Sequence, residues 1–203
     1  MPEVLSLNRE SVSTGDGNTT AGECWSFYAL GTPAPQGSKS PKGRTKTGHV
    51  IMAESSKKVA PWREAVKAAG EGAGPRLDGP LAVCMVFTVV RPAGHFRQGR
   101  NSHLLRESAP IAPATVPDLS KLIRSTEDAI TDIGLWADDA RVSEYATAAK
   151  VFTDTEGCDR LALPSPGVVV ACCHLEDHYR RRSWLMSMAA DRVWDARRKA
   201  AGL

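Results

Sequence analysis

Basic and acidic residues are segregated along this 203-residue chain in a way that could serve phosphate chemistry. Residues 36–67 carry eight lysines and arginines against two glutamates, whereas residues 127–159 carry nine carboxylates against two basic residues. Basic side chains neutralise nucleic-acid phosphates, and clustered carboxylates can hold a divalent cation that activates water for hydrolysis. The segregation fits a metal-dependent nuclease, although a solvated basic loop beside a solvated acidic segment would have the same composition.

A spaced motif within residues 117–142 narrows this interpretation. It begins as Pro-Asp-Leu-Ser-Lys-Leu-Ile-Arg at residues 117–124, continues as Asp-Ala-Ile at 128–130, and ends as Trp-Ala-Asp-Asp-Ala-Arg-Val at 136–142. This resembles the RusA family of Holliday junction resolvases, whose pattern reads Asp-x-Asp-Asn-Leu-x-x-Lys, then Asp-Ala-Leu, then Trp-x-Asp-Asp-x-Gln-Val. Asp118 and Asp139 keep the separation of 21 residues that the resemblance requires. Upstream, residues 31–39 and 55–63 look like the opening of phage and actinobacterial members, so the resemblance covers residues 24–175.

The resemblance implies a small homodimeric endonuclease that cuts four-way DNA junctions with Mg²⁺ or Mn²⁺. It implies catalytic roles for Asp118, Ser120, Arg124 and Asp139, and a metal site made of Asp118, Asp138 and Asp139. Such hard cations prefer carboxylate oxygens and keep several waters, one of which can become the attacking hydroxide. Arg124 stands where the family has lysine. Because its pKa exceeds ~12, we expect it to stabilise phosphate charge rather than to donate a proton.

The expected partners are branched DNA and a second copy of the chain, with no membrane. A homodimer suits the cleavage of a two-fold junction, which needs two equivalent sites. The residues expected to hold the DNA phosphates are Lys39, Lys42, Arg44, Lys46, Lys57, Lys58 and Lys121.

The chain departs from the family pattern at position 120. Ser120 stands where the family has a second catalytic aspartate, and Lys121 replaces the asparagine that follows it. A neutral hydroxyl is a weak Mg²⁺ ligand, and the added lysine charge opposes a cation further. Another carboxylate such as Asp138 or Asp128 could supply the oxygen, a water held by Ser120 could replace it, or the protein could bind junctions without cutting them well.

Less specific interpretations apply to the same residues. Asp118 would also serve as an ordinary helix N-cap, and Asp128 could pair with Arg124 four residues earlier on an exposed helix face. At the level of the whole protein, the alternatives are a junction-binding protein with weak or no cleavage, and a structural accessory protein that works through its C-terminal helix.

The expected elements place these residues on an α+β fold, a small mixed sheet with helices packed on it as in a RusA-like homodimer. A loop is expected over residues 36–49 and another over 92–117. Strands are expected at 24–30, 81–91, 142–152 and 168–174, and helices at 61–69, at 119–131 with Asp118 as N-cap, and at 179–200. We divide the chain into a disordered tail (1–22), a RusA-like nuclease domain (23–176) and a C-terminal helical extension (177–203).

Composition excludes several classes of protein. The formal net charge is only +3, with 42% hydrophobic and 24% charged residues, which is typical of a globular domain rather than of a histone-like or acidic disordered chain. No apolar run approaches the ~20 residues of a membrane span. The first residues lack the pattern of a signal peptide, and five cysteines do not form a paired framework, so we expect a cytoplasmic protein without disulfides.

Overall fold

A computed structural model of the chain describes residues 23–37, 39–44, 47–54, 57–153, 161–181 and 183–202. The tail predicted at residues 1–22 lies outside this part. The four-stranded sheet contains β1 (Cys24–Leu30), β4 (Leu81–Val89), β5 (Val142–Phe152) and β6 (Gly167–His174). A separate two-stranded ribbon contains β2 (Lys39–Arg44) and β3 (Val50–Glu54). The helices are α1 (Val59–Gly70), α2 (Leu119–Asp132), α3 (Leu175–Arg180) and α4 (Trp184–Ala200).

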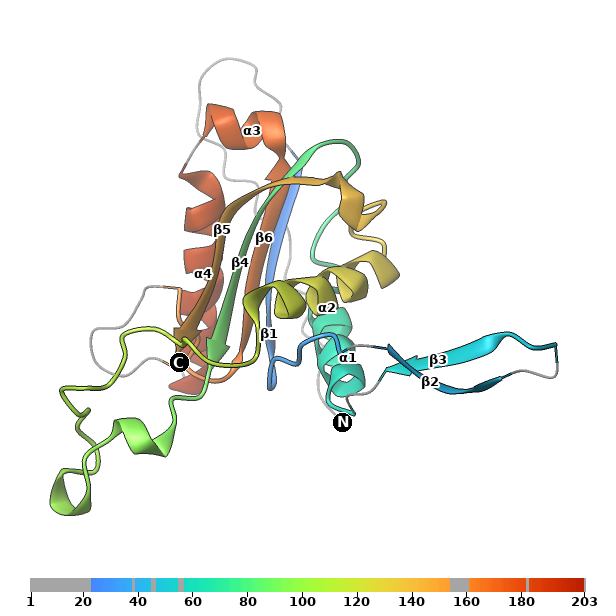
Figure 1. Cartoon of the computed structure of the whole chain (residues 1–203). Helices are drawn as coiled ribbons and strands as arrows, with labels where there is room; N and C mark the ends of the chain where they lie inside the picture. The colour runs from blue at the N-terminus through green and yellow to red at the C-terminus, as the bar shows by residue number, and fades with distance from the viewer. Residues whose placement is uncertain are drawn as a thin grey trace, which may run out of the picture.

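The main sheet is mixed, with the strand order β1-β6-β4-β5. β6 runs antiparallel to both of its neighbours, whereas β4 and β5 are parallel and are connected through α2. A parallel pair needs a crossover connection of this kind, usually helical. Figure 1 shows α1 and α2 on one face of the sheet and α4 on the other. The predicted α+β class with a small mixed sheet is confirmed.

Alternation along the central strands divides the core into two layers. In β4, Val83, Met85 and Phe87 face α1 and α2, whereas Cys84 and Val86 face α4. Successive strand residues point to opposite faces, so a strand between two helical layers must be apolar throughout. β4 and β6 are buried along almost their whole length for this reason.

Three predicted boundaries are corrected. The loop expected at residues 36–49 contains β2, which pairs with β3 in an antiparallel ribbon that projects from the body (Figure 1). The sequence did not indicate β2 as a strand because Pro41 and Gly43 are residues that strands usually exclude. The register of the pairing between β2 and β3 shifts between these two residues. The strand expected at 81–91 ends at Val89, before Pro92. The helix expected at 179–200 is divided into α3 and α4, because the backbone of Arg181 is not helical.

The C-terminal residues predicted as an extension pack closely on the sheet. Leu185, Ala189 and Val193 of α4 are fully buried against the layer that contains Ala82 and Cys84. α4 is therefore the cover of the second sheet face.

Candidate active site

Helix α2 is fixed in place by its inner face. Leu122, Ala129 and Ile130 are buried in the core beneath it. The buried hydroxyl of Thr126 donates to the Leu122 carbonyl (3.0 Å) and accepts from the indole nitrogen of Trp62 on α1 (3.3 Å). This anchoring leaves the opposite face of the helix exposed, with Ser120, Lys121 and Arg124 on it.

Asp118 lies at the N-terminus of α2, as predicted, but its side chain does not cap the helix. The carboxylate pairs instead with the ammonium group of Lys121 at 2.8 Å. The hydrogen bond and charge of Lys121 hold the pKa of Asp118 below its usual value, and Lys150 contributes in the same direction. The carboxylate at this position is thus ionised and already has a cationic partner.

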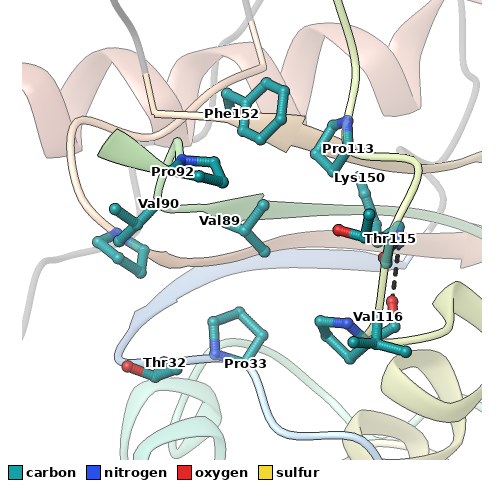
Figure 2. A pocket seen from close by; sticks show the side chains of 12 residues that line it. Thr32, Pro33, Val89, Val90, Pro92, Pro113, Thr115, Val116, Lys150 and Phe152 are labelled. Carbon is teal, nitrogen blue, oxygen red and sulfur yellow. Dashed lines mark hydrogen bonds between the residues drawn. The ribbon is translucent and has the colours of Figure 1, made fainter. Parts of the chain in front are cut away.

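Lys150 of β5 fixes the backbone that leads to Asp118. Its ammonium group donates to the carbonyls of Thr115 (2.7 Å) and Pro117 (2.8 Å). Figure 2 shows this region, where Lys150 borders an apolar pocket of about 210 Å³ lined mainly by proline and valine side chains. The pocket has no carboxylate in its lining, so it is distinct from the acidic part of the site.

A polar hollow of about 300 Å³ lies near the other end of α2. The residues that line it are Gln36, Arg63, Asp128, Thr131, Asp132, Asp138 and Asp139. Four of the seven are aspartates, which offer the oxygen donors that hard divalent cations prefer. The hollow is therefore strongly acidic.

Asp138 and Asp139 are carried into this hollow by the turn before β5. Trp136 is buried, and its indole nitrogen donates to the hydroxyl of Thr131 at 2.7 Å, which ties the turn to α2. The carboxylate of Asp138 accepts from the backbone nitrogen of Ala140 at 2.9 Å and starts a short 3₁₀ helix over Asp139–Arg141. Within the described residues, no hydrogen bond or ion pair involves the carboxylate of Asp139, which is exposed.

Two cations of α1 neutralise the α2 side of the hollow. Arg63 bonds the carboxylate of Asp128 and also approaches the carbonyl of Ser125 (3.4 Å). Lys67 pairs with Asp132 at 2.8 Å. Asp128 therefore pairs with Arg63 of α1, and not with Arg124 four residues earlier on its own helix, which was the alternative interpretation.

The contact between Glu127 and Tyr145 is a feature of the site that the sequence did not indicate. The Tyr145 hydroxyl donates a hydrogen bond to the Glu127 carboxylate. Burial raises the pKa of Glu127, the tyrosine hydrogen bond opposes this rise, and the charges of Asp139 and Asp128 add to it. Burial and the same carboxylate also raise the pKa of Tyr145. Only the tertiary contact between α2 and β5 reveals this pair.

The structure brings some of the predicted metal ligands together and keeps one apart. Asp138 and Asp139 share the hollow, whereas Asp118 does not line it. Asp118 precedes Asp128 by ten residues, which is about 15 Å along a helix. Across the described ranges, no group of three His, Cys, Asp or Glu side chains is close enough to hold a metal ion. The metal roles of Asp118, Asp138 and Asp139, and the catalytic roles of Ser120 and Arg124, stay predictions.

The predicted phosphate-binding residues lie in two places besides α2. Lys39, Lys42 and Arg44 belong to β2, and Lys46 lies outside the described residues. Lys57 and Lys58 are exposed in the turn before α1, where they line a hollow with Gly31, Thr32 and Trp62. Their role in binding DNA also stays a prediction.

Comparison with protein families decides the classification. The family model described as endodeoxyribonuclease RusA matches residues 33–158, which is more than half of the chain. The chain belongs to the RusA endodeoxyribonuclease family. RusA membership indicates the general function of an endodeoxyribonuclease on branched DNA, and the matched segment contains every residue of the acidic hollow.

Two further findings complete the comparison. A search of curated proteins finds no match to this RusA-family chain. Among the described helices, none is both long enough and apolar enough to cross a membrane.

Proposed function

We propose that the protein is a Mg²⁺- or Mn²⁺-dependent endodeoxyribonuclease that resolves four-way DNA junctions as a homodimer. The observation that carries the proposal is the acidic hollow within the segment that matches the RusA family. Its donors are carboxylates, and Asp139 is exposed without an ion-pair partner among the described side chains. This donor chemistry fits a hard divalent cation.

Under this proposal, Asp138 and Asp139 hold the cation, and Asp118, which does not line the hollow, contributes a carboxylate at the start of α2. A bound cation would supply an activated water and would stabilise charge on the phosphate that is cut. Arg124 is exposed on α2 and presents a permanent positive charge with a planar set of donors. It would hold the negative oxygens of the same phosphate. Lys57, Lys58 and the β2–β3 ribbon would hold the flanking DNA backbone, which contributes affinity without sequence preference.

The test is cleavage of a labelled synthetic four-way junction with Mg²⁺, with Mn²⁺ or with a chelator. We expect the natural chain to cut only with the cations. Asp139→Asn should reduce cutting to the background level and leave junction binding within a few-fold, because the carboxylate serves the metal. Glu71→Gln, an exposed carboxylate beyond the end of α1, is the matched control and should cut normally. Cutting by Asp139→Asn, or equal loss of binding and cutting, would contradict the proposal.

A junction-binding protein with little cleavage is the second candidate, and two observations favour it. Ser120 offers no charge, and Asp118, the carboxylate at the start of α2, is paired with Lys121. Comparison with Ser120→Asp separates the two candidates. If only Ser120→Asp cuts while the natural chain binds junctions, the natural protein is chiefly a binder.

A further inference from the structure

The long connection between β4 and α2 has no part in the site described above. Its first part, residues 91–106, contains four arginines, two histidines and no carboxylate. We name residues 93–106 the basic arm. Figure 1 shows the basic arm extending from the body on the side opposite to the β2–β3 ribbon. The chain returns from the basic arm to Asp118, so the arm is joined to that end of α2.

Backbone hydrogen bonds close the basic arm into a narrow hairpin. The backbone nitrogen of Arg97 donates to the Leu104 carbonyl (2.8 Å), and that of Arg106 donates to the His95 carbonyl (2.9 Å). These two bonds enclose an antiparallel bridge between residues 96 and 105. The two sides of the basic arm are therefore held next to each other.

Arg91 fixes the root of the basic arm to the end of β5. Its side chain is buried, and its guanidinium group lies over the ring of Phe152 at 3.9 Å. The same group donates a hydrogen bond to the Pro110 carbonyl at 2.8 Å. His95 packs edge-on against the Phe152 ring. Residues on both sides of the basic arm are thus attached to the body at one place.

The basic arm presents three exposed arginines, which are Arg97, Arg100 and Arg106. The Nε of Arg106 donates to the Phe96 carbonyl at 2.8 Å, and the Nε of Arg97 donates to the Leu105 carbonyl at 3.2 Å. These bonds orient both guanidinium groups and leave the Nη edge of each group as the part that can bind a phosphate.

Little negative charge offsets these arginines. Glu107 follows the basic arm, and its carboxylate lies 3.9 Å from the guanidinium group of Arg97 with the glutamate side chain 97% exposed. A pair so long and so exposed contributes little. Within the described residues, no hydrogen bond or ion pair involves the side chain of Arg100. Most of the positive charge of the basic arm is therefore available to a partner.

We infer that the basic arm is a second DNA-binding element, which binds backbone phosphates at the Asp118 end of α2 while the β2–β3 ribbon binds the backbone on the opposite side of the molecule. DNA as the partner rests on the proposed function. Guanidinium groups bind phosphate oxygens through paired hydrogen bonds, and a projecting row of them suits a charged backbone. The large apolar side chains that the basic arm exposes are Leu104 and Leu105, at 40% and 37%, so charge dominates its surface.

Reversal of one charge tests the basic arm without removing its own hydrogen bonds. Arg100→Glu should weaken binding of a four-way junction in Ca²⁺, because one phosphate contact is lost and a repulsive charge is added. The slope of log affinity against log salt should become smaller by about 1, at ~0.9 for each phosphate. Arg180→Glu on α3 is the matched control, and its affinity and slope should match those of the natural chain.

A variant with Arg97, Arg100 and Arg106 all replaced by glutamine measures the whole basic arm. We expect its slope to be smaller by about 2–3. Unchanged affinity and slope in both arginine variants would overturn the inference. That is also the result expected if the basic arm binds a protein through Leu104 and Leu105 instead of DNA.

Cross-linking tests whether DNA lies along the basic arm. A photoreactive group is attached to the thiol of Ser102→Cys, at the exposed turn of the arm, and the protein is irradiated with the junction. Ser187→Cys, at an exposed position of α4, is the matched control, and the natural chain shows the background from its own cysteines. We expect a protein–DNA adduct from Ser102→Cys well above both. A yield no higher than the control would overturn the inference.

These experiments measure binding, so they separate the basic arm from the proposed function. A natural chain that does not cut, but that loses junction affinity with Arg100→Glu and gives the adduct, would support the inference and contradict the nuclease proposal. A natural chain that cuts, with unchanged salt slopes in the arginine variants, would support the nuclease proposal and overturn the inference.

Discussion

At the scale of single residues, Lys121 has the clearest influence on the site. Its ammonium group holds the carboxylate at the start of α2 in an ion pair at 2.8 Å. The same contact lowers the pKa of Asp118, so Asp118 is ionised over the physiological range and the pair is lost only as the pH falls through that lowered pKa. A cation that binds Asp118 must therefore compete with Lys121.

Lys121→Asn restores the residue of the family pattern and tests this competition. We expect the variant to need less Mg²⁺ for half-maximal junction cleavage, because Asp118 no longer has a bound ammonium group. The pKa of Asp118, followed by carboxyl NMR, should rise toward its usual value. Arg180→Asn removes one partner of an exposed pair with Glu176 and is the control. An unchanged Mg²⁺ requirement in Lys121→Asn would show that the pair does not oppose the metal.

Residue patterns predicted only part of this site. The placement of Asp118 before α2 and of Asp138 and Asp139 before β5 could be predicted from helix and strand periodicity. The partners of Asp128 and Glu127 could not, because Arg63 and Tyr145 come from other elements and meet α2 only in the folded chain. The sequence spacing indicated that Asp118 would meet Asp138 and Asp139. In the structure the full length of α2 lies between Asp118 and these two aspartates.

At the scale of elements, residue patterns predicted three strands of the main sheet well. The strands expected at 24–30, 142–152 and 168–174 agree with β1, β5 and β6 to within one residue at each end. The β2–β3 ribbon was missed because Pro41 and Gly43 are residues that strands usually exclude. The separation of α3 from α4 was missed as well, because no glycine or proline marks the break.

Leu185→Ala tests whether α4 is an integral layer. Leu185 is fully buried between α4 and the sheet, so the variant loses packing and leaves a cavity. We expect the free energy of unfolding to fall by about 2–5 kcal/mol, measured by urea denaturation. Trp194→Ala on the same helix is the control, because Trp194 is 59% exposed. Equal, small effects of both substitutions would mean that α4 does not stabilise the sheet.

At the scale of the whole molecule, three basic residues of β2 (Lys39, Lys42 and Arg44) belong to a ribbon that projects from the body (Figure 1), and Lys121 and Arg124 belong to α2. Each lysine or arginine that neutralises a DNA phosphate releases condensed counterions, so the affinity depends on salt. This arrangement predicts that the ribbon binds the junction independently of the metal.

Replacement of Lys39, Lys42 and Arg44 together by alanine tests the ribbon. If all three bind phosphates, the slope of log affinity against log salt should become smaller by about 2–3, at ~0.9 for each phosphate that the variant no longer neutralises. The slope is measured by junction binding in Ca²⁺ at several salt concentrations. Arg180, Arg197 and Arg198, replaced together by alanine, form the control near α3 and α4. An unchanged slope in the ribbon variant would exclude the ribbon from the interface.

The position of β6 within the sheet determines the order in which this chain can fold during synthesis. β6 is the last strand in the sequence, yet it lies between β1 and β4 and pairs with both. Until about residue 174 has left the ribosome, β1 has no neighbour and β4 has one open, apolar edge. Long-range pairing of this kind is slow and leaves intermediates prone to aggregation. A nascent chain of this protein therefore keeps an incomplete sheet, with the apolar edge of β4 open, until β6 has been synthesised.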